Sequence, residues 1–233
     1  MKYLVFGVLT FVYVNVVMCQ PQTEGFVSLF NGESLDGWVA SEENSESFFV
    51  EDGKLVAKGG RAHLFYNGEV GDHDFSNFEM RLKVMTTAAS NSGVYFHTRY
   101  QKSGWPDTGF EAQVNSKHAD MRKTGSLYGV VNIWVPGDTE EPYAARVDKA
   151  GQVYIQRDEA PSKDGEWFDY YIKVEGDRII VRVDGQTTVD WTQPIGWSKD
   201  RRIGHGTIGF QAHDPSCLVY YKDIEIKVLP ESD

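Results

Sequence analysis

The chain has 233 residues, of which 41% are hydrophobic and 24% are charged, with only 8 prolines. This composition excludes a disordered, collagen-like or multi-span membrane protein and predicts one globular domain, or at most two. The formal net charge of -11 has the wrong sign for neutralising nucleic-acid phosphates or anionic lipid headgroups. We therefore expect neither a nucleic acid nor a membrane surface as a partner.

The first residues predict an export signal. Met1-Lys2 is a short basic start, and the run from Tyr3 to Met18 is uncharged and mostly apolar. Because about 20 residues are needed to cross a bilayer, this shorter run indicates a signal peptide over residues 1–19 rather than a membrane span, with a retained anchor as the alternative. We expect an exported protein, periplasmic or extracellular, that is cleaved after Cys19. Cys19 could instead carry the lipid of a bacterial lipoprotein, although Met18 before it argues against lipidation.

Residues 20–233 are predicted to form a single all-β domain. Aromatic residues make up 13% of the chain and glycines number 23, which favours short strands joined by turns over long helices. Apolar residues alternate without a break from Phe78 to Val84, and Asp52-Gly53 and Asp184-Gly185 fit hairpin turns. In chain order, the predicted strands are 48–50, 54–57, 78–84, 93–99, 109–115, 152–156, 167–174, 178–183, 206–213 and 219–228.

This many short strands predicts two antiparallel sheets packed as a jelly-roll sandwich, with a barrel as the alternative. Little helix is expected. The stretch 116–151 lacks clear alternation, and such long connections commonly line a functional surface. The sequence carries no signal for an oligomeric state.

Three of the predicted strands carry unusual polar rows on the face that points away from the core. These rows are Glu111, Gln113 and Asn115; Tyr95, His97 and Arg99; and Gly209, Gln211 and His213. Amide and imidazole groups suit hydrogen bonds to hydroxyls, and aromatic faces suit sugar rings, so a carbohydrate is the expected ligand. The alternative is a polar cross-strand network that is satisfied internally.

Three aromatic residues in predicted loops could extend such a site. Trp105 precedes Pro106, Trp134 precedes Val135-Pro136, and Tyr128 belongs to the tight loop 124–129. Each could stack on a sugar, although loop tryptophans commonly plug the end of a sandwich core.

Other chemistries find little support in the sequence. The 6 histidines show no HExxH spacing, and neither a CxxC nor a Gly-x-Ser-x-Gly motif occurs. The 2 cysteines cannot form a disulfide scaffold, and Cys217 is interpreted as a small buried hydrophobe. Asp107, Glu111, Asn115 and Asp120 could supply oxygen ligands for calcium, but they match no loop template. We therefore predict no metal site and no cofactor, while a divalent cation stays open.

A series of short motifs resembles the 3-keto-disaccharide hydrolase domain family over nearly the whole of the predicted mature chain, residues 20–233. The motifs are Leu29-Phe30-Asn31-Gly32, Leu35-Asp36-Gly37-Trp38, Val50-Glu51-Asp52-Gly53, Asn91-Ser92-Gly93-Val94, Gly109-Phe110-Glu111-Ala112-Gln113, Thr124-Gly125-Ser126-Leu127-Tyr128-Gly129, Gly165-Glu166-Trp167, Val183-Asp184-Gly185 and the segment 206–213. Each motif is weak alone, but their order and spacing together are specific.

The resemblance implies a concanavalin A-like, glucanase-like sandwich that cleaves glycosides oxidised at C3. A C3 ketone acidifies the C2 proton, so the leaving group at C1 can depart by elimination before water adds. Such an enzyme needs a base, an acid and an oxyanion stabiliser rather than two carboxylates flanking an oxocarbenium ion. A lectin-like, non-catalytic carbohydrate-binding module is the alternative, because the same fold serves both.

Residue roles follow from the resemblance. The base is Glu111 or His213, and the enolate oxygen is stabilised by Arg99 or His97; many relatives place an arginine where this chain has His97. The substrate-binding set is Gln113, Asn115, Gln211, Tyr95, Tyr128, Trp105 and Trp134. Several relatives also carry an aspartate where Ser116 stands here, so a second carboxylate could be missing. We expect side chains 97, 99, 111, 113, 211 and 213 to meet around one cavity.

Overall fold

The structure is a computed structural model that describes residues 25–115, 117–137, 152–197 and 201–231. The predicted signal segment 1–19, with Cys19, lies outside the described residues, and so does Ser116. Within these ranges the protein is all-β, as predicted, with only two short 3-10 helices, η1 (Ser45–Ser47) and η2 (Val70–His73). None of the described helices is long and apolar enough to cross a membrane.

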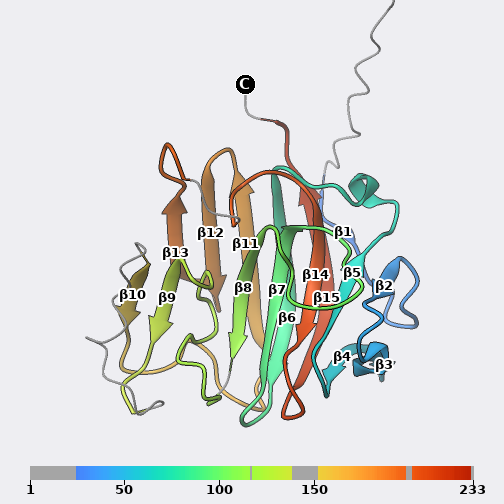
Figure 1. Ribbon diagram of the computed structural model, residues 1–233, viewed down its shortest axis with the longest axis horizontal. Coiled ribbons are helices and arrows are strands. Elements are labelled where there is room, and N and C mark those ends of the chain that lie inside the picture. Colours follow the sequence, from blue (N-terminus) through green and yellow to red (C-terminus); the bar gives the residue numbers. More distant parts are fainter. Residues whose placement is uncertain (1–24, 116, 138–151, 198–200, 232–233) are drawn as a thin grey trace, which may run out of the picture.

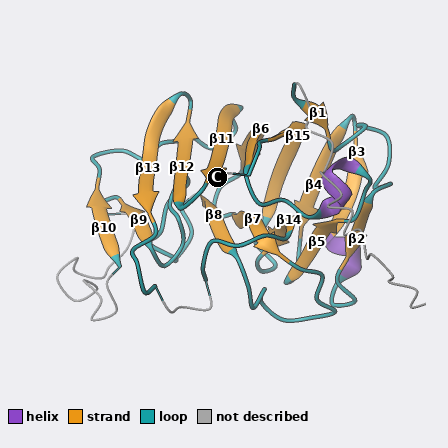
Figure 2. Cartoon of the chain, turned by 90° about the horizontal axis from the view of Figure 1, so that it is seen from above, coloured by secondary structure: helices purple, strands orange, loops and turns teal. Residues whose placement is uncertain are grey.

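Two antiparallel sheets pack face to face (Figures 1 and 2). The larger sheet has the order β13 (Gln186–Thr192), β12 (Arg178–Val183), β11 (Phe168–Glu175), β6 (Phe78–Thr86), β15 (Leu218–Val228), β4 (Lys54–Lys58) and β3 (Phe48–Glu51), and β1 (Val27–Ser28) also pairs with β15. The smaller sheet has the order β2 (Trp38–Ala40), β5 (Ala62–Tyr66), β14 (Thr207–Ala212), β7 (Asn91–Thr98) and β8 (Phe110–Asn115). This arrangement confirms the sandwich and rejects the barrel.

One additional pair of strands departs from the expected antiparallel pattern. Strand β9 (Val131–Trp134) pairs with β10 (Val153–Gln156) in parallel. Parallel neighbours need a long connection between them, and here 18 residues, 135–152, separate the two strands in the sequence.

The hydrophobic core fills the space between the two sheets. On the smaller sheet, Val94, Ala112 and Phe210 face inward, and on the larger sheet Met80 and Ile172 do so. Both predicted hairpin turns form, since Asp52-Gly53 and Asp184-Gly185 have positive φ at both positions, as a type I′ turn requires. Alternation therefore predicts correctly which residues of β8 and β14 are inside, and those of β7 as far as Phe96.

A β-bulge interrupts this alternation in β7. Thr207 pairs with Thr98 and Gly209 pairs with Tyr95, so two residues of β7 oppose the single Ile208 of β14. One of the two, His97, has a φ of 54°, which is unusual for a residue with a side chain. Phe96 keeps its inward position in the core, and the bulge redirects the side chains that follow it, from His97 onward.

Several strands lack a clear sequence signal. Strand β5 is buried at all five positions, so its sequence, Ala-His-Leu-Phe-Tyr, shows no polar face. Strand β9 is likewise buried throughout. Strands covered on both faces give continuous rather than alternating patterns, which explains why they escape a prediction based on alternation.

Candidate active site

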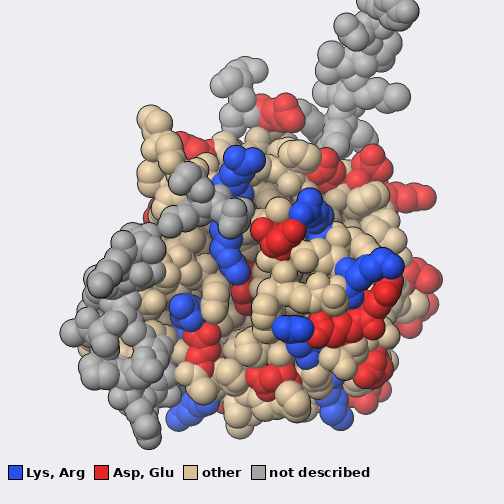
Figure 3. All heavy atoms as spheres, in the orientation of Figure 1, with Lys and Arg blue, Asp and Glu red and all other residues tan. Residues whose placement is uncertain are grey.

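A cavity of about 300 Å³ opens on the outer face of the smaller sheet. Strands β7, β8 and β14 form its floor, and residues from four loops complete the wall. The lining residues are Asn91, Tyr95, Trp105, Glu111, Gln113, Tyr128, Arg201, Gln211 and His213. On the face that carries this sheet, acidic and basic side chains are interspersed (Figure 3).

Glu111 lies at the floor of the cavity and is only 3% exposed. Its Oε2 accepts a hydrogen bond of 2.7 Å from the Tyr95 hydroxyl, which in turn accepts one of 3.0 Å from Nε2 of Gln211. In the amide orientation that satisfies its neighbours, Nε2 of Gln113 donates to Oε1 of Glu111 at 3.0 Å. Three neighbouring strands therefore hold one carboxyl group in place.

Gly93 creates the space that this carboxyl group occupies. A Cβ atom at position 93 would lie 2.5 Å from Oε1 of Glu111, closer than two such atoms can approach. Gly93 lies directly opposite Gln113 in the β7–β8 pairing. The glycine of the Asn-Ser-Gly motif is therefore required by the packing of Glu111 and not by a turn.

The electrostatics of Glu111 are set by burial and by one cation. Burial raises the pKa of Glu111 above its ordinary value, while the charge of Arg201 and the hydrogen bond from Tyr95 act in the opposite direction. The Arg201 guanidinium also lies 5.2 Å from the centroid of the Tyr128 ring. Its Nη1 is buried and has no hydrogen-bond partner among the described residues.

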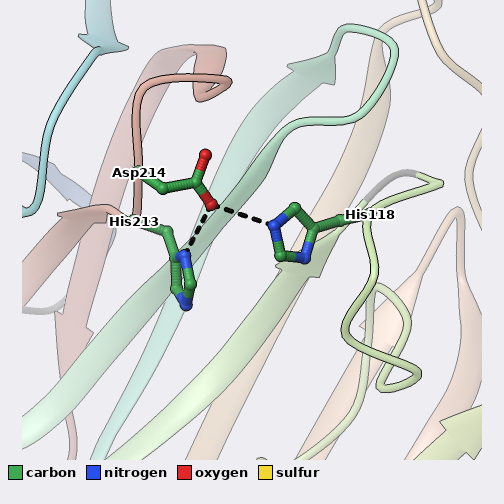
Figure 4. Close-up of side chains that lie close together, drawn as sticks. All are labelled: His118, His213 and Asp214. Carbon is green, nitrogen blue, oxygen red and sulfur yellow. Dashed lines mark hydrogen bonds and ion pairs between the residues drawn. The ribbon is translucent and has the colours of Figure 1, made fainter.

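Two histidines share one carboxylate at the rim of the cavity (Figure 4). Oδ2 of Asp214 lies 2.8 Å from Nδ1 of His213 and 2.9 Å from Nε2 of His118. Burial acts to raise the pKa of Asp214, but hydrogen bonds from Ser216 and His213 and the nearby His118 hold it well below its ordinary value. Asp214 is therefore ionised and accepts from both rings.

The tautomer of His118 follows from its second nitrogen. The backbone N–H of Asp120 donates to Nδ1 of His118 at 3.0 Å, so Nδ1 carries a lone pair and the neutral ring carries its proton on Nε2. That proton points at Asp214. By the same logic, Nδ1 of His213 donates to Asp214, which leaves Nε2 of His213 as an acceptor.

The part of the chain that the structure describes contains one group of side chains that could hold a metal ion. It consists of His118, His213 and Asp214, whose possible ligand atoms all lie within 4.8 Å of one another. A histidine that binds a metal normally donates a proton from its other ring nitrogen. His118 does the reverse, because its Nδ1 accepts from Asp120. The hydrogen bonding therefore fits a His–Asp–His relay better than a metal centre.

Trp105 provides an aromatic platform at the mouth of the cavity. It is 42% exposed, and its ring centroid lies 5.0 Å from that of His213 and 5.7 Å from that of His63. The guanidinium of Arg61 lies 5.1 Å from the Trp105 ring. A rigid, exposed indole beside polar groups is suited to stacking on a sugar ring.

Four of the six side chains expected around one cavity are brought together there: Glu111, Gln113, Gln211 and His213. Tyr95, Trp105 and Tyr128 line the same cavity.

The expectation is wrong for His97 and Arg99. The bulge turns His97 toward the end of the core, where its ring donates from Nε2 to the carbonyl of Ser76 at 2.8 Å and accepts at Nδ1 from the N–H of Gly204 at 3.2 Å. Arg99 is exposed and forms an ion pair with Asp107. Both residues line a second cavity instead.

Two further residues expected to bind substrate lie elsewhere. Trp134 belongs to strand β9 rather than to a loop, is buried and does not line the cavity. Asn115 points beyond the end of the cavity, where its Nδ2 donates to the carbonyl of Asp120 at 3.1 Å.

Four residues of the site were not found from the sequence: Asn91, Arg201, His118 and Asp214. Asn91 belongs to the Asn-Ser-Gly motif, which entered the sequence analysis only as part of the family resemblance. Asp214 follows His213 directly, so the pair His-Asp was available as a signal. Arg201 and His118 lie in long connections, where no periodicity indicates the direction of a side chain.

The chain belongs to the family of 3-keto-alpha-glucoside-1,2-lyase-like domains, whose model matches residues 25–227. This confirms the resemblance found in the sequence. No curated protein has a sequence that matches this chain.

Solved structures share the fold. A candidate glycosyl hydrolase from Parabacteroides distasonis ATCC 8503 is 22% identical, with a TM-score of 0.61, over 91% of this chain and 99% of that one. The carbohydrate binding module CBM66 from Bacillus subtilis has a TM-score of 0.51 at 11% identity, over 82% of this chain and 95% of that one. A galectin-like protein of unknown function from Bacillus subtilis has a TM-score of 0.52 at 9% identity, over 92% and 99% of the two chains.

Proposed function

We propose that this protein cleaves glycosides whose sugar ring carries a ketone at C3, by elimination across C1 and C2 followed by addition of water. The observation that carries the proposal is the convergence of Glu111, His213 and Arg201 on one small cavity. Membership in a 3-keto-alpha-glucoside-1,2-lyase-like family supports the same chemistry. A sugar-binding face alone would need no buried carboxyl group beside an imidazole.

The reaction needs two proton transfers and one stabilised anion. A base removes the C2 proton, and the electrons move onto the C3 oxygen as an enolate. The enolate then collapses, so that C1 and C2 become doubly bonded, the C1–O bond breaks and the leaving oxygen takes a proton. Water finally adds its hydroxyl to C1 and a proton to C2, which releases the free 3-keto sugar.

His213 acts as the base in this proposal. Its Nδ1 donates to Asp214, so Nε2 holds the lone pair that would accept the C2 proton. The ionised Asp214 then stabilises the resulting imidazolium, as a carboxylate does for other catalytic histidines. His118 is a positioning residue, since its proton on Nε2 fixes the carboxylate.

Glu111 supplies the proton to the leaving group. Burial raises the pKa of Glu111, which favours the protonated acid that this step requires. After elimination, the Glu111 carboxylate can take a proton from water while the His213 imidazolium returns one to C2. Both groups thereby regain their starting states at the end of the cycle.

Arg201 stabilises the enolate oxygen. Its Nη1 is buried and without a hydrogen-bond partner among the described residues, which leaves a donor for a developing anion. This assignment replaces His97 and Arg99 in the role that the family resemblance implied for them. Gln211 completes the recognition of ring hydroxyls, because its buried Oε1 also lacks a described partner.

Export is part of the proposal. The basic start and apolar run of residues 1–19 support secretion to the periplasm or exterior, where glycosides are met before uptake.

A non-catalytic sugar-binding module is the second candidate. The exposed Trp105 and the amides of Gln113 and Gln211 favour it, because such groups serve binding as well as catalysis. The two candidates differ in whether the C1–O bond breaks.

The test uses an α-linked glucose disaccharide oxidised at C3 of its non-reducing unit, together with the unoxidised disaccharide. We expect release of glucose only from the oxidised compound, and a slower reaction when its C2 hydrogen is replaced by deuterium. Cleavage of both compounds would contradict elimination. Binding without release from either compound would favour the module.

A further inference from the structure

A second, larger cavity of about 710 Å³ lies on the same outer face of the smaller sheet. Strand β14 contributes Thr207 to this second cavity and Gln211 to the cavity that holds Glu111. Four residues along a strand span roughly 13 Å. This separation is longer than one sugar ring, so a ligand that reaches both cavities must contain several units.

On strand β14, no side chain lies between the two cavities. On β14, the outward position between Thr207 and Gln211 is Gly209, which has no side chain. A Cβ atom there would already lie 3.3 Å from the carbonyl oxygen of Leu64.

A row of aromatic rings, exposed at its two ends and buried in the middle, runs between the two cavities. Tyr100 lines the second cavity and its centroid is 5.7 Å from that of Phe65. Phe65 is 6.1 Å from His63, which is 5.7 Å from Trp105. The two ends of the row, Tyr100 and Trp105, are 41% and 42% exposed. Both belong to the connection between β7 and β8, which thus presents one exposed ring at each cavity.

The second cavity also holds unused hydrogen-bonding capacity. The hydroxyl of Thr98 is buried and has no partner among the described residues, although leaving a buried hydroxyl unsatisfied destabilises the fold. Thr98 lines this cavity, so a ligand hydroxyl can complete the bond. The ion pair of Arg99 with Asp107 and the 2.7 Å contact between Nδ1 of His205 and Oδ1 of Asp74 place further donors and acceptors along the wall.

We propose that the second cavity is a distal sugar subsite, which binds a later unit of the same oligosaccharide whose oxidised terminal unit occupies the Glu111 cavity. The substrate is then a chain of at least three sugar units rather than a disaccharide. Exposed aromatic rings and neutral or paired polar groups recognise uncharged, hydroxyl-rich rings. The proposal rests on the proposed function for the identity of the first unit only.

The experiment compares α-linked gluco-oligosaccharides of two and four units, each oxidised at C3 of the non-reducing unit. We expect kcat/KM to be at least 10-fold higher for the four-unit chain, equivalent to 1.4 kcal/mol of extra transition-state binding. In Tyr100→Ala the ratio between the two chains should fall to near 1. Tyr220→Ala is the matched control, because Tyr220 lies on β15 of the other sheet, and it should keep the wild-type ratio.

Equal kcat/KM for both chains in the wild-type protein would overturn the subsite, and so would a Tyr100→Ala variant that keeps the full ratio while folded. Affinity for the unoxidised chains, measured by calorimetry, separates this outcome from failure of the proposed reaction. If no oxidised chain is cleaved but four units still bind more tightly than two, and Tyr100→Ala removes the difference, the subsite stands without the reaction. If length changes neither turnover nor affinity, the subsite is wrong.

Discussion

The two cavities of the smaller sheet lie on one face, yet His213 and His97, one at each cavity, are bonded in opposite ways. His213 donates from Nδ1 to Asp214, which leaves its Nε2 as an acceptor. Around Glu111, the side chains of three strands bond to one another and leave open capacity at Arg201 and Gln211. At the second cavity, backbone groups satisfy both ring nitrogens of His97. An ionisable residue at a predicted outward-facing position of a strand is therefore not enough to indicate a catalytic role. A catalytic group must also retain a lone pair or a proton that faces the ligand.

The difference arises from one inserted residue. Without the bulge at His97, the His97 ring would share the face of Tyr95. With the bulge, the His97 ring lies at the end of the core and forms hydrogen bonds to the backbone of Ser76 and of Gly204.

The largest expected effect separates the two regions directly. We expect Glu111→Gln and His213→Gln each to lower turnover of a 3-keto-disaccharide by roughly 100-fold or more, because each removes a proton-transfer group. His97→Gln should keep near wild-type turnover per folded molecule while lowering the melting temperature. If the folded His97→Gln protein loses as much turnover as Glu111→Gln, the assignment of the two cavities is reversed.

A smaller loss is expected from Gly93→Ala. The new Cβ would lie 2.5 Å from Oε1 of Glu111, so the carboxyl group must move, and displacement by about 1 Å can lower turnover by roughly 10- to 100-fold. The control is the double variant Gly93→Ala, Glu111→Gln. If Gly93 acts through Glu111, the double variant should be no slower than Glu111→Gln alone. Additive losses would show that the alanine disturbs some other part of the site.

Local alternation predicts most of the fold, and also four of the six side chains expected at the cavity. It works for Glu111, Gln113 and Gln211 because β8 and β14 run regularly past the cavity, so that every second residue points outward. It fails for His97 because a bulge depends on how β7 pairs with β14, and not on the sequence of either strand alone. It misses Arg201 and His118 because the directions of loop side chains are set by tertiary contacts.

The pH dependence of stability should reveal the buried histidines of the smaller sheet. Burial lowers the pKa of both His63 and His97 to about 4, from 6.5. Between these values the unfolded state binds more protons, so stability rises with pH over this window and is lost as pH falls from about 6.5 to 4. The loss is on the order of 3 kcal/mol for each ring. The raised pKa of Glu111 acts in the opposite direction.

Urea unfolding between pH 4.5 and 7.5 measures this slope. His63→Gln and His97→Gln should each flatten the curve, since a glutamine binds no proton in either state. The control is Asn67→Gln at an exposed position, which changes no ionisable group and should leave the slope unchanged. A wild-type slope retained in both buried-site variants would contradict a neutral, desolvated imidazole at these positions.

The smallest effect is expected from removing metal ions, and it tests whether the relay at the rim of the Glu111 cavity is complete without one. Because Nδ1 of His118 accepts the N–H of Asp120, the proton on Nε2 occupies the direction that a metal ion would need. We expect a chelator to leave turnover unchanged, and two-bond ¹H–¹⁵N correlation spectra to show His118 protonated at Nε2. Turnover that is lost to the chelator, restored by a divalent cation, and accompanied by a shift of the His118 proton to Nδ1 would instead make His118, His213 and Asp214 a metal centre. In that case His213 could no longer be the base, and removal of the C2 proton would pass to Glu111.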